Sequence, residues 1–96
     1  MNSRQRAYLK SLAMTMDAVL QIGKSSLTPE ITEAVNEALE ARELIKIHVL
    51  KNCIDDPHMI GEALAERTRS QVVQVIGKKI VLYRESKTKK KIMLPQ

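Results

Sequence analysis

A glycine-lysine-serine triplet is the part of this sequence closest to a phosphate-binding motif. Gly23-Lys24-Ser25 matches the end of a P-loop, in which a glycine-rich turn wraps nucleotide phosphates with its backbone amides. That motif needs another glycine five residues before Gly23, where this chain has Ala18 inside a predicted strand. The sequence therefore argues against ATP or GTP binding.

The same segment suits a phosphate chain in a simpler way. The small residues at 23–26 let the backbone approach a polyanion closely, and Lys24 adds a positive charge. The N-terminus of the helix predicted to follow contributes a partial positive potential. RNA-binding modules use a related Gly-x-x-Gly loop to clamp a nucleic-acid backbone. The alternative is an ordinary strand-to-helix turn, because glycine occurs at turns of every kind.

The other reactive side chains are not arranged for catalysis or metal binding. His48, Cys53 and His58 lack a fourth ligand and the paired spacing of a zinc site. Asp55 and Asp56 are adjacent at a predicted helix cap, where negative charge is favoured for structural reasons. No Ser/His/Asp or Cys/His set stands out, and a 96-residue domain has little room for a catalytic pocket. We expect no enzyme activity, no cofactor, no metal and no small-molecule substrate.

Positive charge is concentrated towards the two ends of the chain. Residues 1–28 carry four basic and one acidic side chain, residues 29–76 five and nine, and residues 77–96 seven and one. This polarity favours a polyanionic partner, because each neutralised phosphate releases counterions. A basic surface that serves solubility is the alternative. The lysine-rich segment 87–91 would extend a phosphate track only if it shares a face with Lys24.

Composition narrows the class of protein further. The chain has no Phe or Trp and only two Tyr, so it predicts recognition of RNA shape and phosphates more than base stacking. One cysteine excludes an internal disulfide, and no run of 18 apolar residues exists to span a membrane. The N-terminus is not typical of a signal peptide. We expect a single domain over residues 1–96 in the cytoplasm.

Hydrophobic periodicity predicts three helices. The first covers residues 3–16, with an apolar stripe of Leu9, Leu12, Ala13 and Met16. The second begins at Thr28-Pro29 and ends near Glu43, and the third begins at Asp56-Pro57; in both, a capping residue precedes a proline. The acidic residues expected to face water on the second helix are Glu33, Glu37 and Glu40.

Four strands complete the predicted order α-β-α-β-α-β-β. We expect them at residues 18–22, 44–50, 72–76 and 79–84. Gly77-Lys78 between the last two suits a two-residue type II′ hairpin turn. Helices that alternate with strands indicate one sheet covered by helices, and the basic residues 87–96 are expected to be partly mobile.

Two long blocks of this sequence resemble a known family. The first is Gln21-Ile-Gly-Lys24, a Thr-Pro helix start and EALEARELIK at residues 37–46. The second is VQVIGKKIVLYR at residues 73–84, with the ending KIMLP at 91–95. They resemble the CRM domain, named for chloroplast RNA splicing and ribosome maturation. Residues 3–95 as a whole look like its stand-alone bacterial form, the YhbY-type proteins.

The resemblance implies a fold, a function and a site. The fold is α/β, an α+β two-layer arrangement of a four-stranded sheet with three helices, similar to the C-terminal domain of bacterial translation initiation factor three. The function is RNA binding, in bacterial members with precursors of the large ribosomal subunit and in plant members during intron splicing. The family's Gly-x-x-Gly loop falls on Gly23, Lys24, Ser25 and Ser26, with Ser26 in place of the closing glycine. A serine hydroxyl can still donate to a phosphate.

The sequence thus predicts an RNA-binding protein that acts in ribosome biogenesis on ribosomal RNA of the large-subunit precursor. The loop and Lys24 would contact the RNA backbone. The residues expected to extend this basic surface are Arg4, Arg6, Lys10, Lys78, Arg84 and Lys87. Contact with a ribosomal protein is a further expectation. The alternatives are a splicing-type factor, a protein-binding adaptor that docks through the acidic second helix, and a small enzyme acting on nucleotides.

Overall fold

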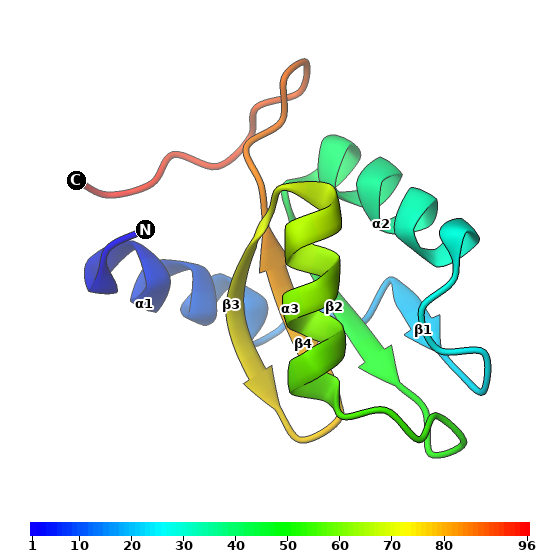
Figure 1. Cartoon of the computed structure of the whole chain (residues 1–96). Helices are drawn as coiled ribbons and strands as arrows, with labels where there is room; N and C mark the ends of the chain where they lie inside the picture. Colours follow the sequence, from blue (N-terminus) through cyan, green and yellow to red (C-terminus); the bar gives the residue numbers. More distant parts are fainter.

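The computed structural model describes residues 1–96 and contains three helices and one four-stranded sheet (Figure 1). The elements follow the predicted order α-β-α-β-α-β-β. Their bounds are α1 Ser3–Ala13, β1 Leu20–Ile22, α2 Pro29–Arg42, β2 Leu44–Val49, α3 Pro57–Thr68, β3 Gln71–Ile76 and β4 Lys79–Tyr83. No helix is long and apolar enough to cross a membrane.

The helices begin at residues whose side chains cap them. The Thr28 hydroxyl accepts a hydrogen bond from the Ile31 N–H at 3.1 Å, and the Asp56 carboxylate accepts from the His58 N–H at 3.1 Å. Pro29 and Pro57 occupy the first turns that follow. Both predicted starts are confirmed, because a capped end and a proline without an N–H remove the unpaired donors of the first turn.

The first helix and the first strand are shorter than predicted. The helix α1 ends at Ala13 rather than at residue 16, although Met16 still packs against the apolar cluster beneath the helix. The strand β1 begins at Leu20 rather than at residue 18, and the Val19 N–H donates to the Lys46 carbonyl before regular pairing begins. Apolar periodicity therefore located the buried side chains correctly but overestimated both elements.

The sheet has strand order β1-β2-β4-β3 and mixed direction. Strand β1 runs parallel to β2, to which α2 connects it, and the remaining pairs are antiparallel. Gly77 has a φ of 55°, whereas Lys78 is not among the residues with positive φ. This combination fits the predicted type II′ turn between β3 and β4.

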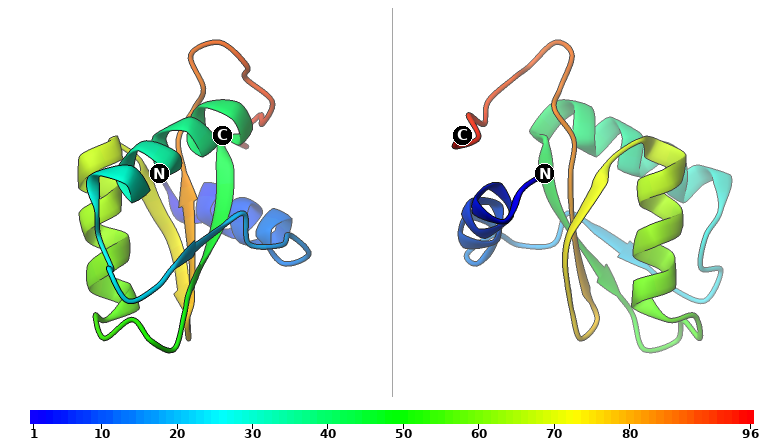
Figure 2. Two further views of the ribbon diagram at one scale, coloured as in Figure 1. Left: turned by 90° about the vertical axis from the view of Figure 1, so that its right-hand side faces the viewer. Right: turned by 60° about the vertical axis from the view of Figure 1, so that its left-hand side comes forward.

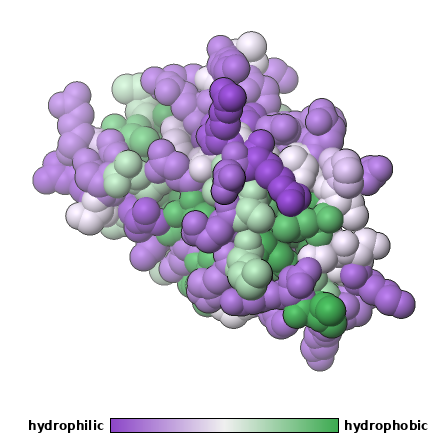
Figure 3. Space-filling view, in the orientation of Figure 1, coloured by the Kyte–Doolittle hydropathy of each residue, from purple (hydrophilic) through white to green (hydrophobic).

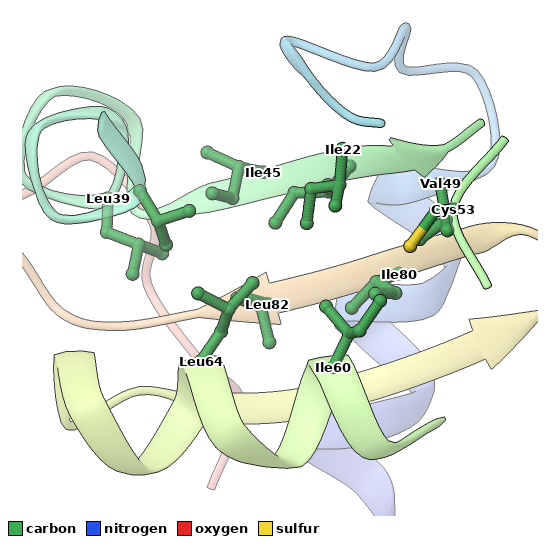
Figure 4. Packing of buried hydrophobic residues seen from close by; sticks show 11 residues of the cluster. Ile22, Leu39, Ile45, Val49, Cys53, Ile60, Leu64, Ile80 and Leu82 are labelled. Carbon is green, nitrogen blue, oxygen red and sulfur yellow. The ribbon is translucent and has the colours of Figure 1, made fainter. Parts of the chain in front are cut away.

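Helices cover both faces of the sheet, so the molecule has three layers where two were expected (Figure 2). The helices α2 and α3 pack on one face, against side chains that include Ile45, Ile47 and Leu82 (Figure 4). The helix α1 packs on the other face, where Leu9 contacts a cluster that includes Val81. The third layer forms because the second face of the sheet also carries apolar side chains, among them Leu44, Val73, Val81 and Tyr83, which need cover from water.

Two glutamates of the α2 C-terminus hold the first half of the C-terminal tail. The buried Glu43 carboxylate accepts hydrogen bonds from the N–H groups of Ser86, Lys91 and Ile92 at 2.7–2.8 Å. Glu40 accepts from Ser86 and from the backbone of Lys87 and Thr88. The prediction that Glu40 faces water is therefore wrong, because its carboxylate is held by the tail. The expected partial mobility of residues 87–96 stays a prediction. Two carboxylates need many donors, and the tail provides them.

Candidate nucleic-acid interface

Three loops meet at one end of the sheet, the lower end in Figure 1. They are the loop 23–26 after β1, the turn 50–53 after β2 and the hairpin turn Gly77-Lys78. The Leu50 N–H donates to the Ile22 carbonyl at 2.8 Å, and the Val49 N–H donates to the Lys78 carbonyl at 2.7 Å. We call this surface the sheet end. The parallel pairing of β1 with β2 brings the first two loops together, because both strands finish at the same edge.

The loop 23–26 is a tight turn with a left-handed residue at its close. The Ser26 N–H donates to the Gly23 carbonyl at 2.9 Å, and Ser26 has a φ of 53°. The N–H groups of Lys24 and Ser25 make no hydrogen bond within the protein. A left-handed residue after a turn is the backbone arrangement of many concave anion-binding sites, in which free N–H groups face the ligand.

Gly23 itself has no positive φ, so its conformation does not require a glycine. A Cβ atom at this position would lie 3.4 Å from the Asn52 Oδ1 and 3.7 Å from a Leu50 methyl group. The absence of a side chain therefore lets the loop lie directly against the turn after β2. The left-handed conformation in this loop falls on Ser26, the residue expected to replace the closing glycine of the Gly-x-x-Gly loop.

Three exposed lysines lie at the sheet end, one on each of its three loops. They are Lys24, Lys51 and Lys78, and none has a carboxylate within ion-pair distance. Sequence reasoning missed Lys51, although its place immediately after a predicted strand next to a parallel neighbour was a usable signal. The nearby acidic residues Asp55 and Asp56 precede α3, and the Asp56 carboxylate is occupied as a helix cap.

Two of the predicted arginines are used inside the fold. The Arg6 guanidinium donates to the carbonyls of Val72 and Val73 at 2.6 and 2.9 Å. The Arg84 guanidinium donates to Asn36 and to the Thr68 carbonyl, and lies 3.7 Å from Glu40. These contacts join α1 to the bulged strand β3, and β4 to α2 and α3. A guanidinium held by backbone carbonyls has few donors left for a phosphate.

The remaining predicted residues lie away from the sheet end. Lys87 belongs to the tail segment that Glu40 and Glu43 hold, residues 86–92, which we call the clasped tail. This segment lies near the C-terminus of α2, at the upper end in Figure 1, about 18 Å along the helix axis from the loop. The exposed Glu33 and Glu37 of α2 lie between the two. Arg4 donates to the Gln96 carbonyl, and Lys10 lines a groove beside α1. The ten predicted residues therefore do not form one continuous basic surface.

The residues considered for metal binding do not come together. Cys53 is buried in the apolar core, His58 lies beside Asp56 at the α3 cap, and no group of three or more His, Cys, Asp or Glu residues is placed to hold a metal ion. Of the three acidic α2 residues expected to face water, Glu40 is engaged with the tail, which leaves Glu33 and Glu37 free for a protein partner.

Residues 1–84 match the family model described as the CRS1 / YhbY (CRM) domain. The chain belongs to the CRM domain family. Its resemblance to the family is therefore confirmed, as is the expected set of three helices and a four-stranded sheet. In this CRM domain, the loop expected to correspond to the family's Gly-x-x-Gly pattern is 23–26, at the sheet end.

Two relatives and one solved structure are similar to this CRM domain over nearly their whole length. The Bacillus subtilis protein named Probable RNA-binding protein YqeI is 45% identical and covers 99% of each chain. A Haemophilus influenzae protein named RNA-binding protein is 33% identical, over 100% of this chain and 96% of its own. The solution structure of SAV1595 from Staphylococcus aureus has a TM-score of 0.83 and 48% identity, with 99% of each chain covered. The fold is thus shared with a solved relative of high sequence identity.

Proposed function

We propose that this CRM domain binds RNA through the sheet end. The observation that carries the proposal is the loop 23–26, whose N–H groups at Lys24 and Ser25 are free, at an end of the sheet where three lysines have no acidic partner. Phosphates of a bound strand would accept from these N–H groups and from Lys24, Lys51 and Lys78. The names of the relatives support RNA as the polyanion.

The chemistry of the sheet end favours the RNA backbone over base sequence. Lysine ammonium groups and loop amides contact phosphates, which fix position and orientation but carry no sequence information. The chain has only two aromatic residues to stack bases. We therefore expect affinity to depend on the path of the phosphate backbone in a folded RNA.

Substitution of Lys24 by glutamate tests the site. Lys24→Glu places a negative charge beside the free amides of the loop, so we expect binding to a short RNA hairpin to weaken about ten-fold at low salt, because a phosphate contact is lost and a repulsion added. Fluorescence anisotropy with a labelled hairpin measures this affinity. Thermal unfolding should be nearly unchanged, because Lys24 is exposed and has no partner.

Lys89→Glu is the matched control, because it makes the same charge change in the clasped tail. Its affinity should fall much less than that of Lys24→Glu. Equal losses in both variants would mean that only net charge matters, and the sheet end would then not be the site.

The RNA target in this proposal is ribosomal RNA of the large-subunit precursor, with assembly of the cytoplasmic ribosome as the process served. The resemblance to the stand-alone bacterial members supports this choice. Crosslinking of the protein to RNA in cells, followed by sequencing of the attached RNA, tests it. We expect enrichment of one region of the large-subunit RNA, and recovery of messenger or transfer RNA instead would overturn the choice of target.

A further inference from the structure

A second cationic surface lies on the face of the sheet that α1 covers. Beside the C-terminal half of α1 there is a groove of about 510 Å³, within the size range of small-ligand sites. We call it the α1 groove. The lining residues that could contact a ligand are Lys10 and Met14 from the α1 side and Lys46, Gln74, Ile76 and Lys79 from the sheet.

The strand register explains why these side chains converge. Lys46 of β2, Val81 of β4 and Gln74 of β3 form one row across three strands. The neighbouring row on the same face contains Lys79 and Ile76. Lys79 is thus the diagonal neighbour of Lys46, about 7–8 Å away. The end of α1 stands over these rows and closes one side of the groove.

Charge in the α1 groove is unbalanced. Three lysines line it and no acidic residue does, and none of the three lysines forms an ion pair. Lys46 is half-buried and lines the groove. Three positive charges around one groove repel one another, and a bound anion relieves that repulsion.

The groove also offers apolar and hydrogen-bonding surface. Met14 is 80% exposed and Ile76 is 61% exposed at its rim, and Val81 lies in its lining. Gln74 is half-buried and lines the groove, and its side-chain amide can both donate and accept hydrogen bonds. A flat, partly apolar group with polar edges and an adjacent negative charge would satisfy all of these surfaces.

The α1 groove adjoins the sheet end at the hairpin turn. Ile76 and Lys79 directly flank the hairpin turn Gly77-Lys78, and Lys78 belongs to the sheet end. An RNA strand that contacts Lys78 could thus continue directly into the groove. An anionic ligand that enters from this side is most simply the same RNA.

From this geometry we infer that the α1 groove receives an unpaired nucleotide of the bound RNA. This inference rests on the proposed RNA-binding function and deepens it. The base lies against Met14 and Ile76, the flanking phosphates contact Lys10, Lys46 and Lys79, and the Gln74 amide contacts the edge of the base. Side-chain amides serve as base-edge contacts in nucleic-acid recognition, and RNA-binding proteins commonly select bases that are splayed out of a helix.

Two hairpin RNAs that differ by one bulged nucleotide test the inference. The wild-type protein should bind the bulged hairpin about five-fold or more tightly than the fully paired one, because one extra base is held. The single variants Lys46→Gln and Gln74→Glu should each abolish most of this preference. Lys24→Glu should weaken both RNAs alike, and the control Lys89→Gln should preserve the wild-type preference. Thermal unfolding confirms that each variant is folded.

The outcomes separate this inference from the proposed function. If the wild-type protein binds neither hairpin, RNA binding itself fails. If it binds both equally, or if the groove variants keep the preference for the bulge, RNA binding stands and the nucleotide site is overturned. NMR provides a second readout: the Met14 methyl signal should shift on addition of the bulged hairpin and not on addition of the paired one. A shift with an acidic peptide but with neither RNA would assign the groove to a protein partner and overturn the inference.

Discussion

Ser26 holds a conformation that most residues avoid. Its φ of 53° is in the left-handed region, and its hydroxyl is buried without a hydrogen-bond partner. Only glycine adopts this region without strain from its Cβ atom. The loop therefore keeps the shape that a closing glycine would give, and the serine pays for it in stability.

Ser26→Gly should stabilise the protein by about 0.5–1 kcal/mol, because relief of the left-handed strain exceeds the added flexibility of the unfolded chain. Urea unfolding measures the change in free energy. Ser25→Gly is the matched control, since Ser25 has no positive φ and gains nothing from glycine. Equal stability of the two variants would contradict the strain.

The Arg6 guanidinium stabilises the fold by donating hydrogen bonds to strand β3. Arg6→Met keeps a long side chain but leaves the Val72 and Val73 carbonyls at the β3 bulge without their donor. We expect a loss of roughly 1–3 kcal/mol in unfolding free energy. Arg4→Met should change stability much less, because Arg4 is exposed and contacts only the chain terminus. Unchanged stability of Arg6→Met together with weaker RNA binding would return Arg6 to the interface.

At the scale of elements, the tail depends on the α2 C-terminus. Burial by itself raises the pKa of Glu43, but hydrogen bonds from the backbone of Ser86, Lys91 and Ile92 outweigh it, and the pKa is lowered from its ordinary value of 4.5. The pKa of Glu40 is also lowered, chiefly by the hydroxyls of Ser86 and Thr88. Both carboxylates therefore bind the tail in their ionised form.

Replacement of one of these carboxylates should release the tail without unfolding the core. Glu43→Gln removes the charge and turns an amide N–H towards backbone donors, so we expect a loss of roughly 1–3 kcal/mol. Hydrogen exchange of the Lys91 and Ile92 amides should accelerate, while that of Leu82 in β4 stays slow. Glu37→Gln, on the exposed face of α2, is the control and should leave the tail amides protected.

Acid should have the same effect as that substitution. A lowered pKa in the folded state means that Glu43 contributes its full stability above pH 4.5 and loses it as the pH falls through the lower folded pKa. We expect the tail amides to lose protection below about pH 4.5, before the sheet unfolds. NMR exchange measured from pH 7 to pH 3 follows this change. A tail that stays protected at pH 3 would contradict the role of the carboxylates.

At the scale of the whole molecule, the basic residues divide among separate surfaces. The sheet end and the α1 groove adjoin at the hairpin, whereas the lysines of the tail lie beyond the acidic face of α2. On the face shown in Figure 3, hydrophilic residues cover most of the surface, and hydrophobic residues are exposed near the centre and at the lower right. Net charge alone thus overstates the surface available to one RNA.

The dependence of RNA affinity on salt should count the lysines that contact phosphate. Lys24→Gln, Lys51→Gln and Lys78→Gln should each reduce the slope of log affinity against log salt by about one, because each contact releases about one counterion. Lys87→Gln and Lys89→Gln should leave the slope nearly unchanged. Titration of the same hairpin at several salt concentrations measures this. Equal reductions from the tail variants would show that the RNA reaches both ends of the molecule.

Local sequence determined the elements and the position of the loop. The Thr28-Pro29 and Asp56-Pro57 starts, the Gly77-Lys78 turn and the alternation of β2 are short-range features, and the structure has all of them. They were predictable because capping, turn conformation and side-chain alternation depend on residues within a few positions of one another.

Only the tertiary structure decided which charged groups are free and which face each occupies. Four charged side chains have partners between 40 and 70 positions away in sequence: Arg6, Arg84, Glu40 and Glu43. Arg84 also donates to the Thr68 carbonyl, which is 16 positions away. The α1 groove likewise needs the strand register and the placement of α1 on the second face. Local sequence does not distinguish a charged side chain that faces water from one that binds a distant carbonyl, because the packing of the whole chain determines its partner.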